Sequence, residues 1–400
     1  MRFLLIMILA ATAFAGCVDS DDPEPTTALP PADPSGGFEP HVIVGVPDSG
    51  INPYHEQFYR PDRVDHPCTY IEAFPCDIPA LNLTVSRDVD LTWEERFEAD
   101  RATWESVQPG DVYWIPQTVF IGAICESLFD STGICILDDT NMHGTGTTSS
   151  VLSENPDALI VFKEGGSSIE PILNSGIPVD IFSVSWGTIV PIPVGGQEVF
   201  GRVYSPIYIL AAGNDPRSVL LDSWAGSTRA ITVGGAYGDN TQEPLAGQQG
   251  DVVSYFCRPT AQTMSLEEMR PSYCGTSFAT PTTAGGISKV VLAIREASGY
   301  TGTTVDDLVD PVAGISVDEL KEAVFRTASY EPENQYPGAG TGELPLNPVA
   351  PWVQWGWGFY DGLVANATID HFFVEPAPAK PDAAVTYMGA LYTARETLHG

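Results

Sequence analysis

Gly275-Thr276-Ser277-Phe278-Ala279-Thr280-Pro281 is a run of mostly small residues that ends in proline. Glycine gives the backbone a flexible approach to Ser277, and the residues that follow the serine begin a helical pattern. Pro281 lacks the N–H that would bond the Ser277 carbonyl four residues earlier. No packing requirement dictates this combination. The run therefore predicts a serine hydroxyl presented at the start of a helix.

Two other segments place reactive side chains where secondary structure changes. In the first, a carboxylate lies just past a β-branched run, in the sequence Val46-Pro47-Asp48-Ser49-Gly50-Ile51-Asn52. In the second, a histidine precedes small residues that open a helical pattern, in the sequence Asn141-Met142-His143-Gly144-Thr145-Gly146-Thr147. Each alone has an ordinary explanation, because Asp-Ser-Gly is usually a turn. Together with Ser277 they stand in the order Asp, His, Ser, which is one of the known orders of a catalytic triad.

Short apolar runs alternate with helical patterns along most of the chain. Such alternation favours an α/β fold with a mostly parallel sheet and helices on both faces. The expected strands are 41–46, 158–162, 179–184, 207–212 and 230–233, and the expected helices are 88–107, 282–296 and 317–329.

These segments resemble the subtilisin-like serine proteases over roughly residues 40–366. Ile209 to Asn214 is similar to the strand that carries that family's oxyanion asparagine, and Phe182 to Gly187 is similar to its edge strand that pairs with substrate backbone. Gly356 to Asn366 resembles the family's closing glycine-rich turn and helix. The resemblance implies a three-layer peptidase domain over 38–370, with an insertion at about 60–138.

The resemblance also implies a chemistry. Ser277 would be the nucleophile of a serine endopeptidase, His143 its general base, and Asp48 the group that orients the imidazole. The Asn214 amide and the Ser277 N–H would stabilise the oxyanion. No cofactor is required for this reaction, although structural Ca²⁺ is common in the family and acidic loops here could bind it. The remaining expected substrate-binding residues are Ser185, Trp186, Gly187, Ala212 and Gly213.

Two alternatives stay open. The chain could be a non-catalytic surface protein that binds peptides or a partner on the same scaffold, or it could be a lipase or esterase. The absence of a Gly-x-Ser-x-Gly elbow argues against an esterase of the α/β-hydrolase type. His55-Glu56 begins like a zinc-protease helix but lacks the second histidine.

The charge of the chain restricts its partners. Aspartate and glutamate number 52 against 18 lysines and arginines, which gives a formal net charge of −34. Such a surface repels nucleic-acid phosphates and anionic lipids. Hydrophobic residues make up 43% of the 400 residues, enough for a sizeable core. We expect a monomer that acts on proteins or peptides.

The two ends of the chain differ from its middle. The chain begins with a positive residue, an apolar run and a small-residue end, namely Arg2, Phe3 to Ala11 and Phe14-Ala15-Gly16-Cys17. This pattern predicts a signal segment over 1–17 with a lipobox-like end, or an ordinary signal peptide. Residues 18–37 read as a disordered Pro-rich tether, and 371–400 as a C-terminal tail. We therefore expect an extracellular protein that is lipid-anchored at the cell surface through Cys17.

Seven cysteines are an odd number, and using Cys17 as a lipid site would leave six. Those six fall into three sequence-local pairs, although six cysteines allow fifteen connectivities. No Cys-x-x-Cys or Cys-x-x-His spacing supports zinc. The expected disulfides are Cys68–Cys76, Cys125–Cys135 and Cys257–Cys274.

Overall fold

The structure is a computed structural model, and it describes residues 37–125, 142–165, 168–186, 206–214, 230–236, 245–246, 250–302, 315–330 and 349–399. The expected signal segment 1–17 with Cys17, nearly all of the tether 18–37, Gly187 and Cys135 lie outside these residues.

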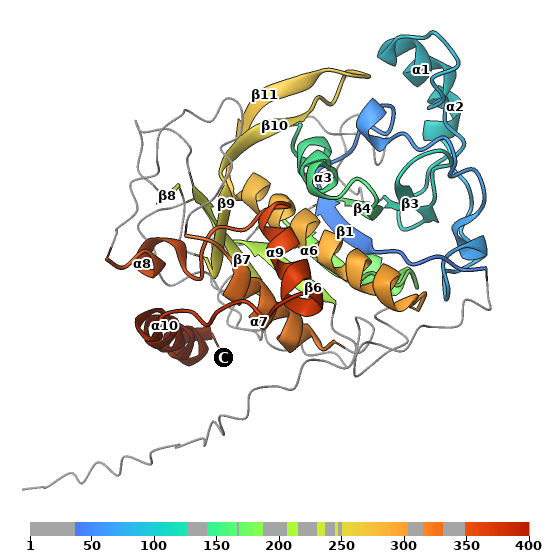
Figure 1. The fold of residues 1–400 in the computed structure, drawn as a ribbon. Helices are drawn as coiled ribbons and strands as arrows, with labels where there is room; N and C mark the ends of the chain where they lie inside the picture. Colours follow the sequence, from blue (N-terminus) through green and yellow to red (C-terminus); the bar gives the residue numbers. More distant parts are fainter. Residues whose placement is uncertain are drawn as a thin grey trace, which may run out of the picture. The chain divides into compact units, whose positions relative to one another are not determined.

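A mostly parallel β-sheet forms the centre of the fold (Figure 1). Its strand order is β2-β3-β4-β1-β5-β6-β7-β8, and β9 also pairs with β7. Only the β2–β3 and β7–β8 pairs are antiparallel. The α/β fold expected from the sequence is confirmed. The strands are β1 (Ile43–Asp48), β2 (Val112–Tyr113), β3 (Phe120–Ile124), β4 (Leu159–Glu164), β5 (Ile181–Val184), β6 (Ile207–Ala211), β7 (Ile231–Ala236), β8 (Leu245–Ala246) and β9 (Val252–Tyr255).

Side chains of the sheet enter two separate hydrophobic layers. Val44 and Val46 of β1 pack in the same layer as residues of α3, α6, α7 and α9, whereas Ile43 packs in the layer that contains Ile172 of α4. Alternate residues of a strand face opposite sides of a sheet, so this division means that helices cover both faces. These helices are α3 (His143–Glu154), α4 (Glu170–Asn174), α6 (Thr276–Ser298), α7 (Val317–Thr327) and α9 (Val364–Phe373).

The expectation that 182–187 belongs to an edge strand is wrong. β5 lies between β1 and β6 and is hydrogen-bonded to both. All four of its residues are buried, as the apolar Ile181-Phe182-Ser183-Val184 run allows. Ser185 and Trp186 follow the C-terminal end of this strand, where Ser185 is buried and Trp186 is partly exposed.

The described part of the expected insertion contains two short helices, α1 (Trp93–Ala99) and α2 (Arg101–Trp104), rather than one helix over 88–107. The break is at Asp100, whose carboxylate accepts hydrogen bonds from the Thr84 N–H (2.6 Å) and the Tyr54 hydroxyl (2.9 Å). Asp100, the residue at which α1 ends, therefore uses its side chain for hydrogen bonds to other segments. Two short 3₁₀ helices precede α1 in the chain, η1 (Glu56–Phe58) and η2 (Pro67–Thr69).

An antiparallel hairpin of β10 (Cys257–Ala261) and β11 (Met269–Cys274) runs along α3 and leads directly into α6 (Figure 1). The Cys257–Cys274 disulfide joins its two ends, as the sequence predicted. Gly275 follows the second cysteine at once. The disulfide therefore restrains the backbone immediately before Ser277.

The segment expected as a tail, 371–400, contains a helix, α10 (Asp382–His399), which follows α8 (Trp352–Trp355) and α9. Arg395 of α10 is fully buried and forms an ion pair of 2.6 Å with buried Asp251. The prolines that suggested a tail lie before α10, not within it. Within the described residues, no helix combines the length and apolar character needed to cross a bilayer.

Candidate active site

Asp48 is the last residue of β1, a central strand with parallel partners on both sides. Its side chain is only 4% exposed. The Ser49 N–H donates to Oδ1 (2.8 Å). A buried carboxylate requires such donors to remain ionised at low energetic cost. The fold therefore presents an oriented carboxylate at the C-terminal end of the parallel strands.

His143 is the first residue of α3, and its Nδ1 lies 2.7 Å from Asp48 Oδ1. Since an ionised carboxylate can only accept, Nδ1 carries the proton and Nε2 is the acceptor in the neutral ring. Met142, immediately before, has a left-handed backbone with φ of 60°, which is uncommon for a residue other than glycine. The predicted Asp48–His143 pair is thus present in the structure.

Gly144 explains why a small residue follows the histidine. A Cβ at this position would lie 2.2 Å from the Gly50 carbonyl oxygen, well inside van der Waals contact. The Gly144 N–H also donates to the Ser49 hydroxyl (3.0 Å). The start of α3 is therefore held directly against the turn that follows Asp48.

Ser277 is the second residue of α6, two positions after Gly275, whose backbone conformation favours glycine. Gly275, the N-cap, has φ of +151° and ψ of 157°, a conformation that residues with a side chain rarely adopt. The Ser277 carbonyl has no helical donor because residue 281 is proline, and the Ser185 hydroxyl donates to it instead (2.8 Å). The Ser277 hydroxyl donates in turn to the Ser185 carbonyl (2.9 Å).

The structure does not form the expected hydrogen bond between His143 and Ser277. The serine hydroxyl is bonded to the Ser185 carbonyl, while the His143 ring packs edge-on against Phe278, the residue after the serine (centroids 5.4 Å apart). Hydrogen bonds between catalytic groups are often long or misaligned before a substrate binds. His143 thus contacts the residue that follows Ser277, and the Ser277 hydroxyl would have to leave the Ser185 carbonyl before it could bond the imidazole.

Asn214 follows β6 and is anchored to the start of α6. Its Oδ1 accepts hydrogen bonds from the Thr276 N–H (2.9 Å) and the Thr276 hydroxyl (3.0 Å). This arrangement leaves its Nδ2 amide beside Gly275, where an added Cβ would lie 3.6 Å from both Nδ2 and the Ser277 nitrogen. The first N–H groups of a helix have no intrahelical acceptor. Two N–H donors are thus gathered near the hydroxyl of Ser277.

The other candidate residues lie around these groups. Ser185 bonds Ser277 directly, and the Trp186 indole N–H donates to the Pro47 carbonyl (3.2 Å) beside Asp48. Ala212 pairs with Val233 through its N–H, and Gly213, with φ of +97°, sets the turn into Asn214. The Cys68–Cys76 disulfide is also present, and Cys125 is disulfide-bonded.

Thr147 is a site residue that the sequence did not single out. Its hydroxyl is fully buried and lies 2.9 Å from Asp48 Oδ2 and 3.1 Å from the Gly144 carbonyl. A hydroxyl has one proton, and the closer, charged acceptor is the carboxylate. Thr147 is four residues after His143, so the helical period places both on one face of α3. That spacing is the signal that could have identified it.

Asn52 is a second residue that the sequence analysis missed. It is fully buried, and its N–H donates to the Thr145 hydroxyl (3.0 Å). Its side-chain amide donates to the Gln262 and Ser265 carbonyls, and its Oδ1 accepts from the Trp93 indole (3.1 Å). Asn52 therefore ties together α3, the tip of the hairpin and α1 near the Asp48 turn. The sequence could not predict that Asn52 is buried, because a polar residue in a predicted turn is usually exposed.

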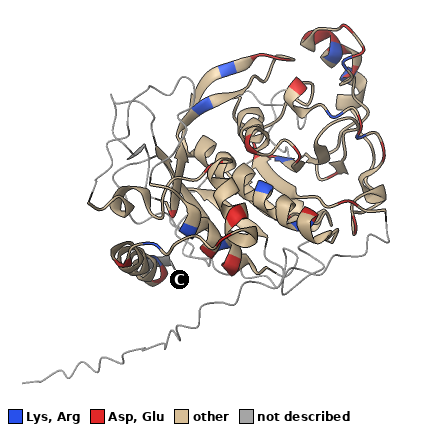
Figure 2. Ribbon diagram, viewed as in Figure 1, with Lys and Arg blue, Asp and Glu red and all other residues tan. Residues whose placement is uncertain are grey.

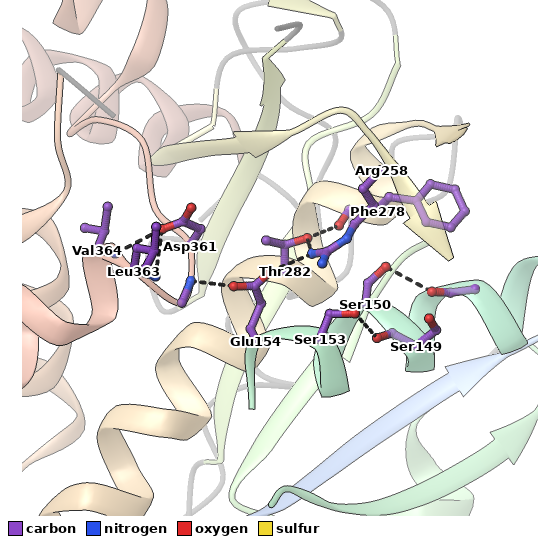
Figure 3. Close-up of polar contacts among 12 residues, drawn as sticks. Ser149, Ser150, Ser153, Glu154, Arg258, Phe278, Thr282, Asp361, Leu363 and Val364 are labelled. Carbon is purple, nitrogen blue, oxygen red and sulfur yellow. Dashed lines mark hydrogen bonds and ion pairs between the residues drawn. The ribbon is translucent and has the colours of Figure 1, made fainter. Parts of the chain in front are cut away.

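A buried ion pair cross-links the two helices that carry the histidine and the serine (Figure 3). Arg258 of β10 bonds Glu154 at the end of α3 (2.9 Å) and also donates to Thr282 of α6. The second Glu154 oxygen accepts from the Gly362 N–H (2.7 Å). Burial, with the nearby charge of Glu154, raises the pKa of Asp361 above its ordinary value. This network fixes α3 relative to α6 away from the reactive groups.

No group of three metal-ligating side chains occurs among the residues that the structure describes. The site offers a carboxylate, an imidazole, a hydroxyl and N–H donors, which is a set suited to nucleophilic attack and proton transfer.

Neither a protein-family model nor a curated protein matches the chain. Solved structures with similarity include an alanine mutant of the protease domain of PatA, at 14% identity over 84% of this chain and 98% of that one, with a TM-score of 0.45. Others are the prenylagaramide maturation protease PagA (15%, 86% and 96%, 0.41) and a lanthipeptide protease (14%, 82% and 87%, 0.45). At these scores the likenesses carry no argument about function, which has to be inferred from the site itself.

Proposed function

We propose that this chain is a serine endopeptidase of the subtilisin-like kind that cleaves peptide bonds through an acyl-enzyme. The observation that carries the proposal is the 2.7 Å hydrogen bond between Asp48 and His143, formed beside a serine at a helix start. The order of the three residues in the chain and the N–H donors near Ser277 support it.

In this mechanism the Ser277 hydroxyl leaves the Ser185 carbonyl and turns toward His143 Nε2. Its oxygen bonds to the substrate carbonyl carbon while its proton passes to Nε2. The oxyanion that forms accepts hydrogen bonds from the Asn214 amide and the Ser277 N–H. The peptide C–N bond then breaks, and the amine leaves with the proton from His143. Water, deprotonated by the same ring, hydrolyses the ester and restores the serine.

Labelling with a serine-directed sulfonyl fluoride and hydrolysis of casein test the proposal together. We expect stoichiometric labelling at Ser277 and casein cleavage, both of which Ser277→Ala abolishes. Ser106→Ala, which removes an exposed hydroxyl of the insertion, is the matched control and should keep both. Folded wild-type protein that neither reacts nor cleaves casein would leave the peptide- or partner-binding function as the better assignment. Ester cleavage without action on casein would favour an esterase.

We also propose that the protein is exported and anchored by a lipid on Cys17. The support is the Arg2 start, the apolar run before Phe14-Ala15-Gly16-Cys17, and an odd cysteine count with disulfides elsewhere in the chain. Metabolic labelling with a palmitate analogue, followed by cell fractionation, tests this. Label should appear in the membrane fraction and disappear in Cys17→Ser. Unlabelled protein in the medium would show ordinary signal-peptide cleavage instead.

A further inference from the structure

Arg270 differs from the other arginines that the structure describes. Each of the others is bonded to a carboxylate or to backbone carbonyl oxygens, whereas Arg270 has neither kind of partner. The others are Arg60, Arg63, Arg87, Arg96, Arg101, Arg258, Arg295, Arg326 and Arg395.

The surroundings of Arg270 make this lack of an acceptor unexpected. The chain has 52 acidic residues against 18 basic ones, so carboxylates are abundant. Glu268 is only two residues away on the same hairpin, yet its carboxylate is within reach of Gln262. Among the residues that the structure describes, the hydrogen-bond acceptor recorded for the Arg270 guanidinium is the weak Met142 sulfur, at 4.0 Å. Within the described residues, folding therefore leaves a half-buried cation without a carboxylate or carbonyl acceptor.

Arg270 is also held in one place, next to the candidate site. Its guanidinium carbon lies 4.2 Å from the centre of the Tyr273 ring, and both residues belong to the exposed strand β11. Blue in Figure 2 marks the arginine and lysine positions along the ribbon, including β11. The Tyr273 ring in turn packs on Phe278 (4.4 Å) and stands edge-on to His143 (6.3 Å). A stacked guanidinium loses little further freedom when it binds a ligand. One side chain, Tyr273, thus separates the cation from the imidazole.

We propose that Arg270, stacked on Tyr273, binds an acidic side chain of the peptide substrate and so determines specificity. The proposal rests on the peptidase function above. The planar guanidinium matches a carboxylate through two parallel N–H···O bonds, and stacking on the tyrosine ring holds it in place for this contact. The overall charge of −34 repels acidic peptides, so a preference for them has to come from a local contact.

The test compares matched peptides with the protein and two variants of equal charge. Fluorogenic hexapeptides carry glutamate or glutamine at one of six positions around the scissile bond, with neutral residues elsewhere. Arg270→Gln removes the proposed contact, and Arg326→Gln removes the same charge from α7, where Arg326 pairs with Glu322. The measured quantity is the ratio of kcat/KM for the glutamate peptide to that for the glutamine peptide.

We expect wild-type protein to prefer glutamate by about tenfold at one position, as one charge-assisted contact would give. Arg326→Gln should keep this ratio, and Arg270→Gln should reduce it to one or below. Equal ratios in wild type and Arg270→Gln would overturn the proposal. So would an equal loss in both variants, because that would assign the effect to net charge.

A binding measurement separates this proposal from the peptidase assignment. Fluorescence anisotropy with the uncleaved peptides gives Kd for Ser277→Ala and for Ser277→Ala/Arg270→Gln. If the wild type cleaves no peptide, a glutamate preference in Kd that requires Arg270 still supports the acidic subsite. If the wild type cleaves peptides with no such preference in kcat/KM or Kd, the subsite is wrong and the peptidase stands.

Discussion

Ser185→Ala removes the hydroxyl that donates to the Ser277 carbonyl at 2.8 Å. That carbonyl has no donor within α6, because residue 281 is proline, and Ser185 is only 5% exposed, so water has little access. A buried acceptor left without its donor costs about 1–3 kcal/mol. We expect the free energy of unfolding to fall by this amount, measured by urea denaturation followed by circular dichroism.

A double-mutant cycle with Pro281→Ala tests the cause. Alanine restores an N–H at residue 281, which can donate to the Ser277 carbonyl, so Ser185→Ala should cost less in that background. The cycle cancels the packing change that each substitution makes by itself. We expect a coupling free energy of about 1 kcal/mol between the two positions. Strictly additive effects would refute the reasoning, because the proline would then not be what makes the Ser185 hydroxyl necessary.

Three more predictions concern groups around the same fold. Thr147→Val removes the donor to Asp48 Oδ2, so kcat on a cleavable peptide should fall about 10- to 100-fold with KM unchanged, while Thr147→Ser should retain most activity. Arg395→Met leaves Asp251 buried without its partner and should lower the unfolding free energy by about 3–5 kcal/mol in urea denaturation; an unchanged midpoint would contradict the buried pair. Burial lowers the pKa of His55 below its ordinary 6.5, so the stability that its neutral form contributes is present above pH 6.5 and is lost as the pH falls. Between pH 7 and 5, His55→Gln should therefore lose less unfolding free energy than the wild type.

The parallel strands could be predicted because burial on both faces leaves a local signature. The runs at 41–46, 158–162, 179–184 and 207–212 correspond to β1, β4, β5 and β6, and each is mostly apolar and contains at least two valine or isoleucine residues. Their order in the sheet could not be read from the runs themselves, because pairing depends on contacts between distant segments. This is why β5 was expected at an edge although it lies in the interior.

The polar parts of the site were harder to predict. Asp48 and His143 were identified from their neighbours in sequence, and the structure pairs them. The roles of Thr147 and Asn52 arise from burial against segments that are distant in sequence. For Thr147 the only local sign was its spacing of four residues from His143, and for Asn52 there was none. The same holds for β11, whose exposed Met-Arg-Pro-Ser-Tyr-Cys sequence carries no strand alternation and contains a proline.

The C-terminal helix was missed for a related reason. Composition indicated a tail because prolines cluster at 376–381, but the helix begins just after them, at Asp382. Its attachment depends on Arg395 and the Trp357–Tyr392 hydrogen bond of 2.8 Å, both of which join it to residues far back in the chain. The sequence of the segment itself could not predict these contacts, because their partners lie elsewhere in the chain.

The buried pair between Asp251 and Arg395 also sets an order of events during synthesis. The two residues are 144 positions apart, so Asp251 emerges from the ribosome long before its counter-ion has been made. Until then, closing the sheet around β9 would bury the Asp251 carboxylate without its ion-pair partner. β9 can therefore settle fully only after residue 395 has been synthesised, and a nascent chain arrested before that residue should stay partly open and sensitive to proteases.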